Sequence, residues 1–330
     1  MDPVRIGCLG AARITNNALV KPARATPGAV VTAIAARDEG RARAYADKHR
    51  IATAYGSYAA LLADPAVDAV YNPLPNGLHG TWTVRALEAG KHVLCEKPFT
   101  ANAEEAELVA AAAGRTGLVV MEAFHWRYHP LAARMLEVVA SGELGEVRRV
   151  EAMVCFPNLK RDDIRWDLGL AGGALMDAGC YAVHLVRTLA GAEPAVVCAH
   201  AKERSPGVDA AMSAEVSFDD GRTGQVRCSM QSLPRVNATV IGERATMKVT
   251  NPLAPQIWHR LTVKGSAGSR RERVAGGATY AYQLAAFVAA VRDGAPTHTP
   301  PADSIATMRV IDAIYRAAGM QPRTPTVVGA

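Results

Sequence analysis

The chain has 330 residues, of which 49% are hydrophobic and 21% charged, and its formal net charge is +6. This length is enough for two domains of ordinary size. No uninterrupted apolar run approaches the roughly 20 residues that span a bilayer, so no membrane segment is expected. The basic residues are scattered rather than gathered in one patch, which argues against nucleic-acid binding. We therefore expect a globular protein whose partner is a small molecule.

The N-terminus runs directly into a strand-like segment and lacks the basic and apolar regions of a signal peptide. The six cysteines include no Cys-x-x-Cys pair, and several stand in apolar settings. Buried free thiols in a reducing compartment are the expected state. A cytoplasmic location follows as the default expectation.

The first 122 residues alternate strand-like and helix-like segments, which is the βαβ pattern. Strands are expected over residues 4–9, 30–35, 69–71, 92–95 and 118–121, and helices over residues 41–49, 57–63, 80–89 and 103–114. Five short strands with intervening helices predict an α/β fold, a doubly wound parallel sheet of the Rossmann type. Residues 1–122 are therefore assigned to a dinucleotide-binding domain.

From residue 123 the pattern changes, and residues 123–330 are assigned to a second domain for substrate binding and oligomerisation. Helices over 131–141 and 173–189 are followed by strand-like runs over 196–201, 214–218, 224–230, 237–241 and 245–249. Turn sequences separate these runs, which predicts a C-terminal α/β domain with an open, largely antiparallel sheet. Further helices are expected over 280–292 and 304–318, with Asp303 as an N-cap. The last helix, within residues 303–319, is expected to pack back toward the first domain.

The turn after the first strand reads Gly10-Ala11-Ala12-Arg13-Ile14-Thr15. A strand, a glycine turn and a helix start would direct backbone N–H groups and the positive helix end at a pyrophosphate. Of the usual G-x-G-x-x-G motif only the first glycine, Gly10, stands, and Ala12 and Thr15 replace the others. The turn is a candidate cofactor site, with a plain strand-to-helix turn as the alternative.

The second strand ends in Arg37-Asp38. An acidic residue there would bind the ribose 2′-hydroxyl, whereas an arginine would pair with a 2′-phosphate. Because Arg37 comes first, NADP is favoured, and NAD stays open if Asp38 faces the ribose. Arg13 could add a second guanidinium or could face solvent.

The third strand leads into a loop with two prolines and an Asn-Gly, which suits a wall beside the nicotinamide. Pro73, Leu74 and Asn76 are its candidate contacts. His79 follows directly and precedes a helix, so a structural role at the helix start is favoured over catalysis.

The run 93–95 ends abruptly in Glu96-Lys97-Pro98. In open α/β sheets ligands bind outside the carboxyl ends of the strands, so Lys97 would project into the crevice. An ordinary charged pair at a strand end is the alternative.

A further group lies in the segment that opens with Gly172-Gly173. If a helix begins after these glycines, Asp177 and Tyr181 share a face and His184 lies one turn further. Three polar groups on an apolar helix indicate a site, although a buried hydrogen-bonded trio that anchors the helix is the alternative.

Together these motifs resemble the glucose-fructose oxidoreductase and inositol dehydrogenase family (Gfo/Idh/MocA). The resemblance rests on Gly10 with its small followers, Pro73-Leu74-Pro75-Asn76, Glu96-Lys97-Pro98 and Asp177-x-Gly179-x-Tyr181, and it spans nearly the whole chain. Residues 121–124 and Tyr181 are most similar to the branch with dimeric dihydrodiol dehydrogenase and NADP-dependent xylose dehydrogenase. Asn72 departs from the aliphatic residue typical of its position.

The resemblance implies that Lys97 and Tyr181 are the catalytic pair, with Asp177 nearby, and that Lys97–Pro98 is a candidate cis bond. It also implies a homodimer or higher homo-oligomer formed through the outer face of the C-terminal sheet. Glu96, like Lys97, would lie at the cofactor.

Hydride transfer between a carbinol carbon and a nicotinamide requires an acid/base for the hydroxyl proton. Tyrosine is a weak base near neutral pH, and a neighbouring ammonium favours its phenolate form. Tyr181 assisted by Lys97 is the favoured acid/base, and His184 is the alternative.

Aromatic and basic side chains suited to a sugar follow residue 123 and precede the Gly172 turn. The candidate substrate contacts, besides Asp177 and Tyr181, are Phe124, Trp126, Arg127, Arg165 and Trp166. A metal site at Glu122, His125 and His129 is disfavoured because nothing ensures that these side chains converge.

The sequence thus predicts an NAD(P)-dependent oxidoreductase acting on a sugar, polyol or cyclic diol. Two other functions stay open. One is a redox-neutral hydrolase or isomerase that retains its nicotinamide, and the other is a non-enzymatic cofactor-sensing regulator on the same fold.

Overall fold

The computed structural model describes residues 2–266 and 268–327, and the chain divides into two compact units. The first unit runs to His125 and takes in Tyr280–Ile305, and the second comprises Trp126–Thr279 and Ala306–Thr326. The predicted boundary after residue 122 assigned residues 280–305 to the second domain, whereas the structure places them in the first unit. The cause is backbone pairing, because Glu122 N donates to Thr299 O (3.1 Å) and so joins this segment to the first sheet.

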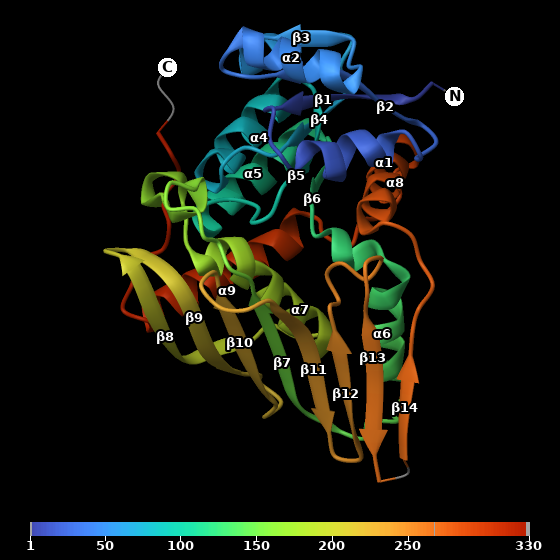
Figure 1. Ribbon diagram of the computed structural model, residues 1–330, viewed down its shortest axis with the longest axis vertical. Coiled ribbons are helices and arrows are strands. Elements are labelled where there is room, and N and C mark those ends of the chain that lie inside the picture. The colour runs from blue at the N-terminus through green and yellow to red at the C-terminus, as the bar shows by residue number, and fades with distance from the viewer. Residues whose placement is uncertain (1, 267, 328–330) are drawn as a thin grey trace. The chain divides into compact units, whose positions relative to one another are not determined.

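The core of the first unit is a six-stranded, fully parallel sheet with strand order β3-β2-β1-β4-β5-β6 (Figure 1). Its strands are β1 (Val4–Leu9), β2 (Ala29–Ala35), β3 (Thr53–Tyr55), β4 (Ala69–Asn72), β5 (His92–Cys95) and β6 (Val120–Glu122). This is the Rossmann order, which confirms the predicted fold class. The short strand β3 was not predicted from the sequence.

Three of the first unit's helices begin at a side chain that caps them. The unit's helices are α1 (Lys21–Ala23), α2 (Glu39–His49), α3 (Tyr58–Leu62), α4 (His79–Glu88), α5 (Ala103–Thr116) and α8 (Thr279–Asp293). Asp38, Ser57 and Asn102 accept the N–H groups at the starts of α2, α3 and α5. The caps hold the turns after the strands at the edge where cofactors bind in such sheets.

The second unit is built on an eight-stranded sheet with strand order β14-β13-β12-β11-β7-β10-β9-β8. Its strands are β7 (Val147–Cys155), β8 (Ala195–Ser205), β9 (Val208–Ser217), β10 (Thr223–Ser229), β11 (Arg235–Gly242), β12 (Ala245–Thr250), β13 (Arg260–Gly265) and β14 (Gly268–Glu272). All neighbours are antiparallel except β7 and β10, which run parallel. The predicted largely antiparallel second sheet is therefore confirmed.

Strand β7 lies in the middle of this sheet, yet the sequence analysis assigned no strand there. Its inward side chains Val150 and Ala152 are buried, whereas Arg149 and Glu151 interrupt the apolar pattern on the other face. Those charges are paired, because Arg149 donates to Glu151 (2.7 Å) and to Glu215 of β9 (2.8 Å). Cross-strand ion pairs thus stabilise charged residues in a strand, and these residues interrupt the apolar alternation by which a strand is predicted.

Helix α7 (Cys180–Ala190) lies across β7, β10 and β11 on one face of this sheet (Figure 1), and α6 (Pro130–Ala140) contacts it. A π-helical turn, Leu175–Gly179, precedes α7, so the predicted helix 173–189 is not one regular α-helix. Residues Leu168–Ala190 are long and apolar enough to cross a membrane, but 83% of the most apolar window is buried. A core helix passes that same criterion.

The last helix, α9, spans Pro301–Ala317. It begins two residues before the predicted cap, so Asp303 lies in its first turn and is not the N-cap. The helix start at Pro301 fits the preference of proline for a first helical position, where its missing N–H costs nothing.

The six cysteines all lie among the described residues and none forms a disulfide. Five are buried, as predicted for free thiols. Cys198 is exposed, contrary to a uniformly buried set, because β8 is an edge strand with outward positions open to solvent.

Candidate active site

The turn after β1 brings a backbone carbonyl, a thiol and a hydroxyl together around Gly10. Gly10 has φ +119°, a conformation that favours glycine, and a Cβ there would approach Leu74 Cδ2 at 3.2 Å. Thr15, fully buried, donates to Gly10 O (3.4 Å), so its side chain closes the turn. Ala11, Ala12 and Ile14 are half-buried and Arg13 is exposed. The turn continues into a π-helical segment, Asn16–Val20.

The end of β2 separates the two cofactor alternatives. Asp38 Oδ1 accepts Arg41 N (2.7 Å) and caps α2, so this carboxylate is already engaged. Arg37 is exposed. Burial raises the pKa of Tyr58, whereas the positive charges of Arg37 and Arg41 act to lower it. Arg41 Nη2 also donates to Ala11 O (3.0 Å).

Arg41 therefore links the start of α2 to the Gly10 turn, and it was not predicted from the sequence. Helical spacing does not relate it to Arg37, because Arg37 precedes the extended N-cap Asp38 and lies outside α2. Arg37 and Arg41 both act electrostatically on Tyr58, and we call them the cationic pair; of the two, Arg41 contacts Ala11.

The buried side-chain amide of Asn72 holds the loop after β4 in place. Asn72 Nδ2 donates to His79 O (3.0 Å) and to Thr83 Oγ1 (3.2 Å), and its Oδ1 accepts Leu74 N (3.4 Å). The unusual residue at position 72 thus shapes the predicted wall. Pro73 and Leu74 of that wall are buried, whereas Asn76 is half-buried.

His79 is buried at the start of α4 and ties two loops together. Its Nδ1 lies 2.7 Å from Pro98 O, and its Nε2 lies 2.7 Å from Leu74 O. Burial lowers the pKa of His79 to about 4, although both carbonyl contacts oppose that shift. His79 thus joins the loop after β4 to the turn that carries Lys97, the structural role that the sequence favoured.

Lys97 stands at the carboxyl end of β5, half-buried, in a turn fixed by its neighbours. Tyr71 of β4 donates to Glu96 Oε1 (2.7 Å), and Lys97 N donates to Glu96 Oε2 (3.3 Å). The Lys97–Pro98 peptide bond is cis, as the family resemblance implied.

An aromatic pair lies close to this lysine in the first unit. The His125 ring packs 4.2 Å from the Tyr280 ring, centroid to centroid. Burial and, second, the charge of Lys97 lower the pKa of His125 to about 3. Burial and the charge of Glu96 raise the pKa of Tyr280. Tyr280 was not predicted, because it reaches this edge only through the return of residues 280–305.

In the second unit the structure brings two predicted site residues into contact. Arg165 Nε donates to Asp177 Oδ2 (2.8 Å), and its Nη1 donates to Asp163 Oδ1 (3.1 Å). The nearby Asp177 charge is the largest cause raising the pKa of Arg165. Asp177 itself lies in the π-helical turn, whereas Tyr181 lies in α7 and is half-buried.

The other predicted residues differ in access. His184 is 1% exposed, and its ring meets the equally buried Trp126 edge-on, with centroids 5.3 Å apart. Phe124 is fully buried, and Arg127 is half-buried. Phe124 and Trp126 thus offer no open ring face for stacking.

Trp166 lies under Arg204, whose guanidinium is 4.5 Å from the ring centroid. Its buried indole N–H has no hydrogen-bond acceptor among the described residues. Trp166 directly follows Arg165, so the indole and the guanidinium belong to the same loop.

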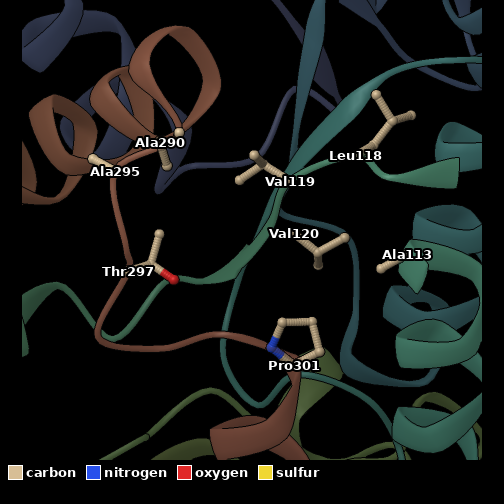
Figure 2. A pocket seen from close by; sticks show the side chains of 9 residues that line it. Ala113, Leu118, Val119, Val120, Ala290, Ala295, Thr297 and Pro301 are labelled. Atoms are coloured by element: carbon tan, nitrogen blue, oxygen red, sulfur yellow. The ribbon is translucent and has the colours of Figure 1, made fainter.

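A separate cavity of about 250 Å³ lies beside edge strand β6 (Figure 2). It is lined by apolar side chains such as Leu118, Val119 and Pro301, with Thr297 as a polar member. It stands at the amino end of β6, whereas ligands of such sheets bind at the carboxyl ends. Across residues 2–266 and 268–327, no group of three or more His, Cys, Asp or Glu is arranged to hold a metal ion.

The buried histidines predict an acid-sensitive fold. Because the folded pKa of His125 is below its unfolded value, the unfolded chain binds more protons between about pH 6.5 and pH 3. The free energy of unfolding should thus fall as the pH drops through this window, by up to about 3 kcal/mol at pH 4. His125→Phe keeps a ring against Tyr280 and should reduce this fall. Denaturant titrations at several pH values measure it, and equal falls in both proteins would contradict the assignment.

Comparison with known proteins shows which family models and relatives the chain matches. Residues 4–124 match the family model GFO_IDH_MocA, an oxidoreductase family with an NAD-binding Rossmann fold, and residues 132–248 match the GFO/IDH/MocA C-terminal domain. The chain is 40% identical over 317 residues to D-xylose 1-dehydrogenase (NADP(+)) 2 of Haloferax volcanii, covering 94% of this chain and 96% of that protein. It is 34% identical over 223 residues to trans-1,2-dihydrobenzene-1,2-diol dehydrogenase of Bos taurus, covering 67% and 66%.

Among solved structures, a 3-ketoreductase from Actinomadura kijaniata in complex with NADP and TDP-benzene is similar, with a TM-score of 0.90 and 30% identity. The match covers 96% of this chain and 98% of that one. With both family models matched in order and relatives aligned over almost their full length, the chain belongs to the Gfo/Idh/MocA family of oxidoreductases, as its motifs predicted.

Proposed function

We propose that this protein is an NADP-dependent oxidoreductase that transfers a hydride between the nicotinamide and a hydroxyl or carbonyl carbon of a sugar, polyol or cyclic diol. The observation that carries the proposal is the fixed turn of Lys97 at the carboxyl end of β5, where such sheets bind their cofactor. Relatives named as a xylose dehydrogenase and a dihydrodiol dehydrogenase support the substrate class.

The residues at the end of β2 fit NADP. Asp38 is engaged as a helix cap, and the exposed Arg37 with Arg41 offers two guanidinium groups for a 2′-phosphate. The Gly10 turn would hold the pyrophosphate through its backbone N–H groups, with Arg13 alongside. Pro73, Leu74 and Asn76 would line the nicotinamide. The bound cofactor supplies the hydride acceptor or donor.

The chain's own residues handle the proton. In oxidation, the substrate hydroxyl gives its proton to the Tyr181 oxygen, and the positive charge of Lys97 favours the phenolate form that receives it. In reduction the same proton returns from Tyr181. Tyr181 is half-buried whereas His184 is closed off by Trp126, which favours the tyrosine as acid/base.

Substrate hydroxyls would be oriented by the Arg165–Asp177 pair. Arg165 is half-exposed and keeps donors beyond those that meet Asp177 and Asp163, so it can bind a hydroxyl without breaking the pair. A polyhydroxylated substrate suits this set of donors and acceptors.

Replacing the cationic pair should change the cofactor preference. Arg37→Ala and Arg41→Ala should each raise the KM for NADP about ten- to hundredfold, because each removes a charge-assisted contact, and leave the KM for NAD within about twofold. Arg43→Ala, on the same helix and paired with Glu39 at the surface, is the matched control. A wild-type preference for NAD, or an unchanged KM for NADP in both variants, would overturn the NADP assignment.

Replacing the catalytic pair should abolish most turnover. Turnover is measured against a panel of aldoses, polyols and cyclic diols. Tyr181→Phe should lower kcat by about 10²- to 10⁴-fold, because it removes the acid/base. Lys97→Met should lower kcat by at least about 10²-fold, because it removes a positive charge that stabilises the phenolate. The exposed Lys48→Met in the last turn of α2 is the control. Absorbance of the reduced nicotinamide reports turnover.

The alternatives give different results. Substrate conversion without net change in added cofactor would instead favour a redox-neutral enzyme with retained nicotinamide. Full activity of Lys97→Met would contradict the proposed mechanism. If His184→Asn lost activity and Tyr181→Phe kept it, the acid/base would be His184.

We further propose that the outer face of the second sheet mediates a homo-oligomer. The paired charges Arg149, Glu151 and Glu215 lie on this face, among half-buried side chains such as Met153 and Ser213. Arg149→Glu leaves three carboxylates together and should shift the protein to monomer in sedimentation equilibrium. A monomeric wild-type protein would overturn this proposal.

A further inference from the structure

A buried ionic cluster in the second unit contains none of the predicted site residues. Asp209, on β9, and Arg323, beyond the end of α9, are 0% and 3% exposed. Arg323 Nη2 donates to Asp209 Oδ1 (2.7 Å), as does Tyr315 of α9 through its hydroxyl (2.9 Å). The guanidinium also lies 4.1 Å from the centroid of the Tyr315 ring. Buried ion pairs stabilise folds weakly because their desolvation costs much, so this cluster calls for another explanation.

The cluster contacts the backbone of the turn that opens the helix with Asp177 and Tyr181. Arg323 Nε donates to Gly172 O (2.7 Å), and Leu175 N donates to Asp209 Oδ2 (2.6 Å). Gly173 has φ +138°, and a Cβ there would come within 3.0 Å of Asp209, Arg323 and Tyr315 alike. The turn is therefore seated against the cluster with no room for a side chain.

The other side of the same turn holds the Arg165–Asp177 pair. Gly173 N donates to Arg165 O (2.9 Å), and Asp177 N donates to Gly173 O (3.1 Å). Arg165 Nε then donates to Asp177 Oδ2 (2.8 Å). Both members of the pair are thus attached by their main chains to the turn that Asp209 and Arg323 hold.

We propose that Asp209, Tyr315 and Arg323 are positioning residues for the reaction, and that they set where Arg165, Asp177 and Tyr181 stand. This inference rests on the proposed function. The carboxylate accepts the Leu175 N–H at the helix start, where an anion is favoured, and the guanidinium holds the carbonyl one turn before it. Misplacement of a reacting group by about 1 Å can cost on the order of 10²-fold in rate, so an anchor at this turn acts on kcat.

The test separates positioning from stability. Arg323→Met leaves Asp209 buried without its cation and should lower both the Tm and kcat, because an uncompensated buried charge destabilises a fold. Asp209→Asn combined with Arg323→Met removes both charges and should recover much of the Tm. Its kcat should stay at least about tenfold low, since Gly172 O still lacks its donor. Arg323→Lys keeps the charge without the Nε contact and should give an intermediate kcat.

The control is Arg115→Met, an exposed arginine in the last turn of α5. It should leave kcat and Tm unchanged. In all variants the KM for NADP should stay within about twofold, because the proposed cofactor residues lie in the first unit. A double variant that regains wild-type kcat together with its Tm would show a merely structural role and overturn the proposal.

Hydrogen exchange of the Gly173, Leu175 and Asp177 amides gives a readout that does not depend on turnover. These amides should exchange at least about tenfold faster in Arg323→Met and in the double variant, with α7 beyond residue 184 unchanged. Unchanged exchange would overturn the anchor even in an active enzyme. Faster exchange in a protein that turns over no member of the panel would support the anchor and count against the proposed function alone.

Discussion

The hydrogen bonds between the turns that follow β4 and β5 are the constraint on which the first unit's site depends. His79 contacts the carbonyls of Leu74 and Pro98, and Tyr71 donates to Glu96, so Lys97 stands between two buried ties. A flexible lysine on a free loop would sample many positions, and ordering it at the moment of reaction would cost side-chain and backbone entropy. Here the backbone of the turn is already held in the folded chain.

The same principle operates in the second unit with different chemistry. The start of the helix that carries Asp177 and Tyr181 is held by a buried carboxylate and a buried guanidinium rather than by histidine and tyrosine. In both units a buried polar or charged side chain from another element reaches the main chain of the turn next to a candidate site residue. Main-chain contacts position a side chain without occupying its functional group, which leaves the functional atoms available to ligands.

The charges of the chain also serve different ends in different places. Arg149 pairs with Glu151 and Glu215 across strands, and Asp38 caps α2. Arg37, by contrast, is exposed just beyond the end of β2. The cap uses Asp38 Oδ1, so the exposed guanidinium of Arg37, rather than the capping carboxylate, is the group proposed to distinguish the two dinucleotides.

Local patterns by themselves determined much of this protein. The alternation of short apolar runs and helices indicated the Rossmann sheet, and Gly10, Glu96-Lys97-Pro98 and Asp177-x-Gly179-x-Tyr181 indicated the family, because turns and strand ends demand particular residues at fixed spacing. Only the tertiary structure decided that β7 is a central strand, that residues 280–305 return to the first unit with Tyr280, and that Arg41, Asp209 and Arg323 hold site turns. Each depends on partners tens to more than a hundred residues away, and no local pattern records a contact whose other half lies so far along the chain.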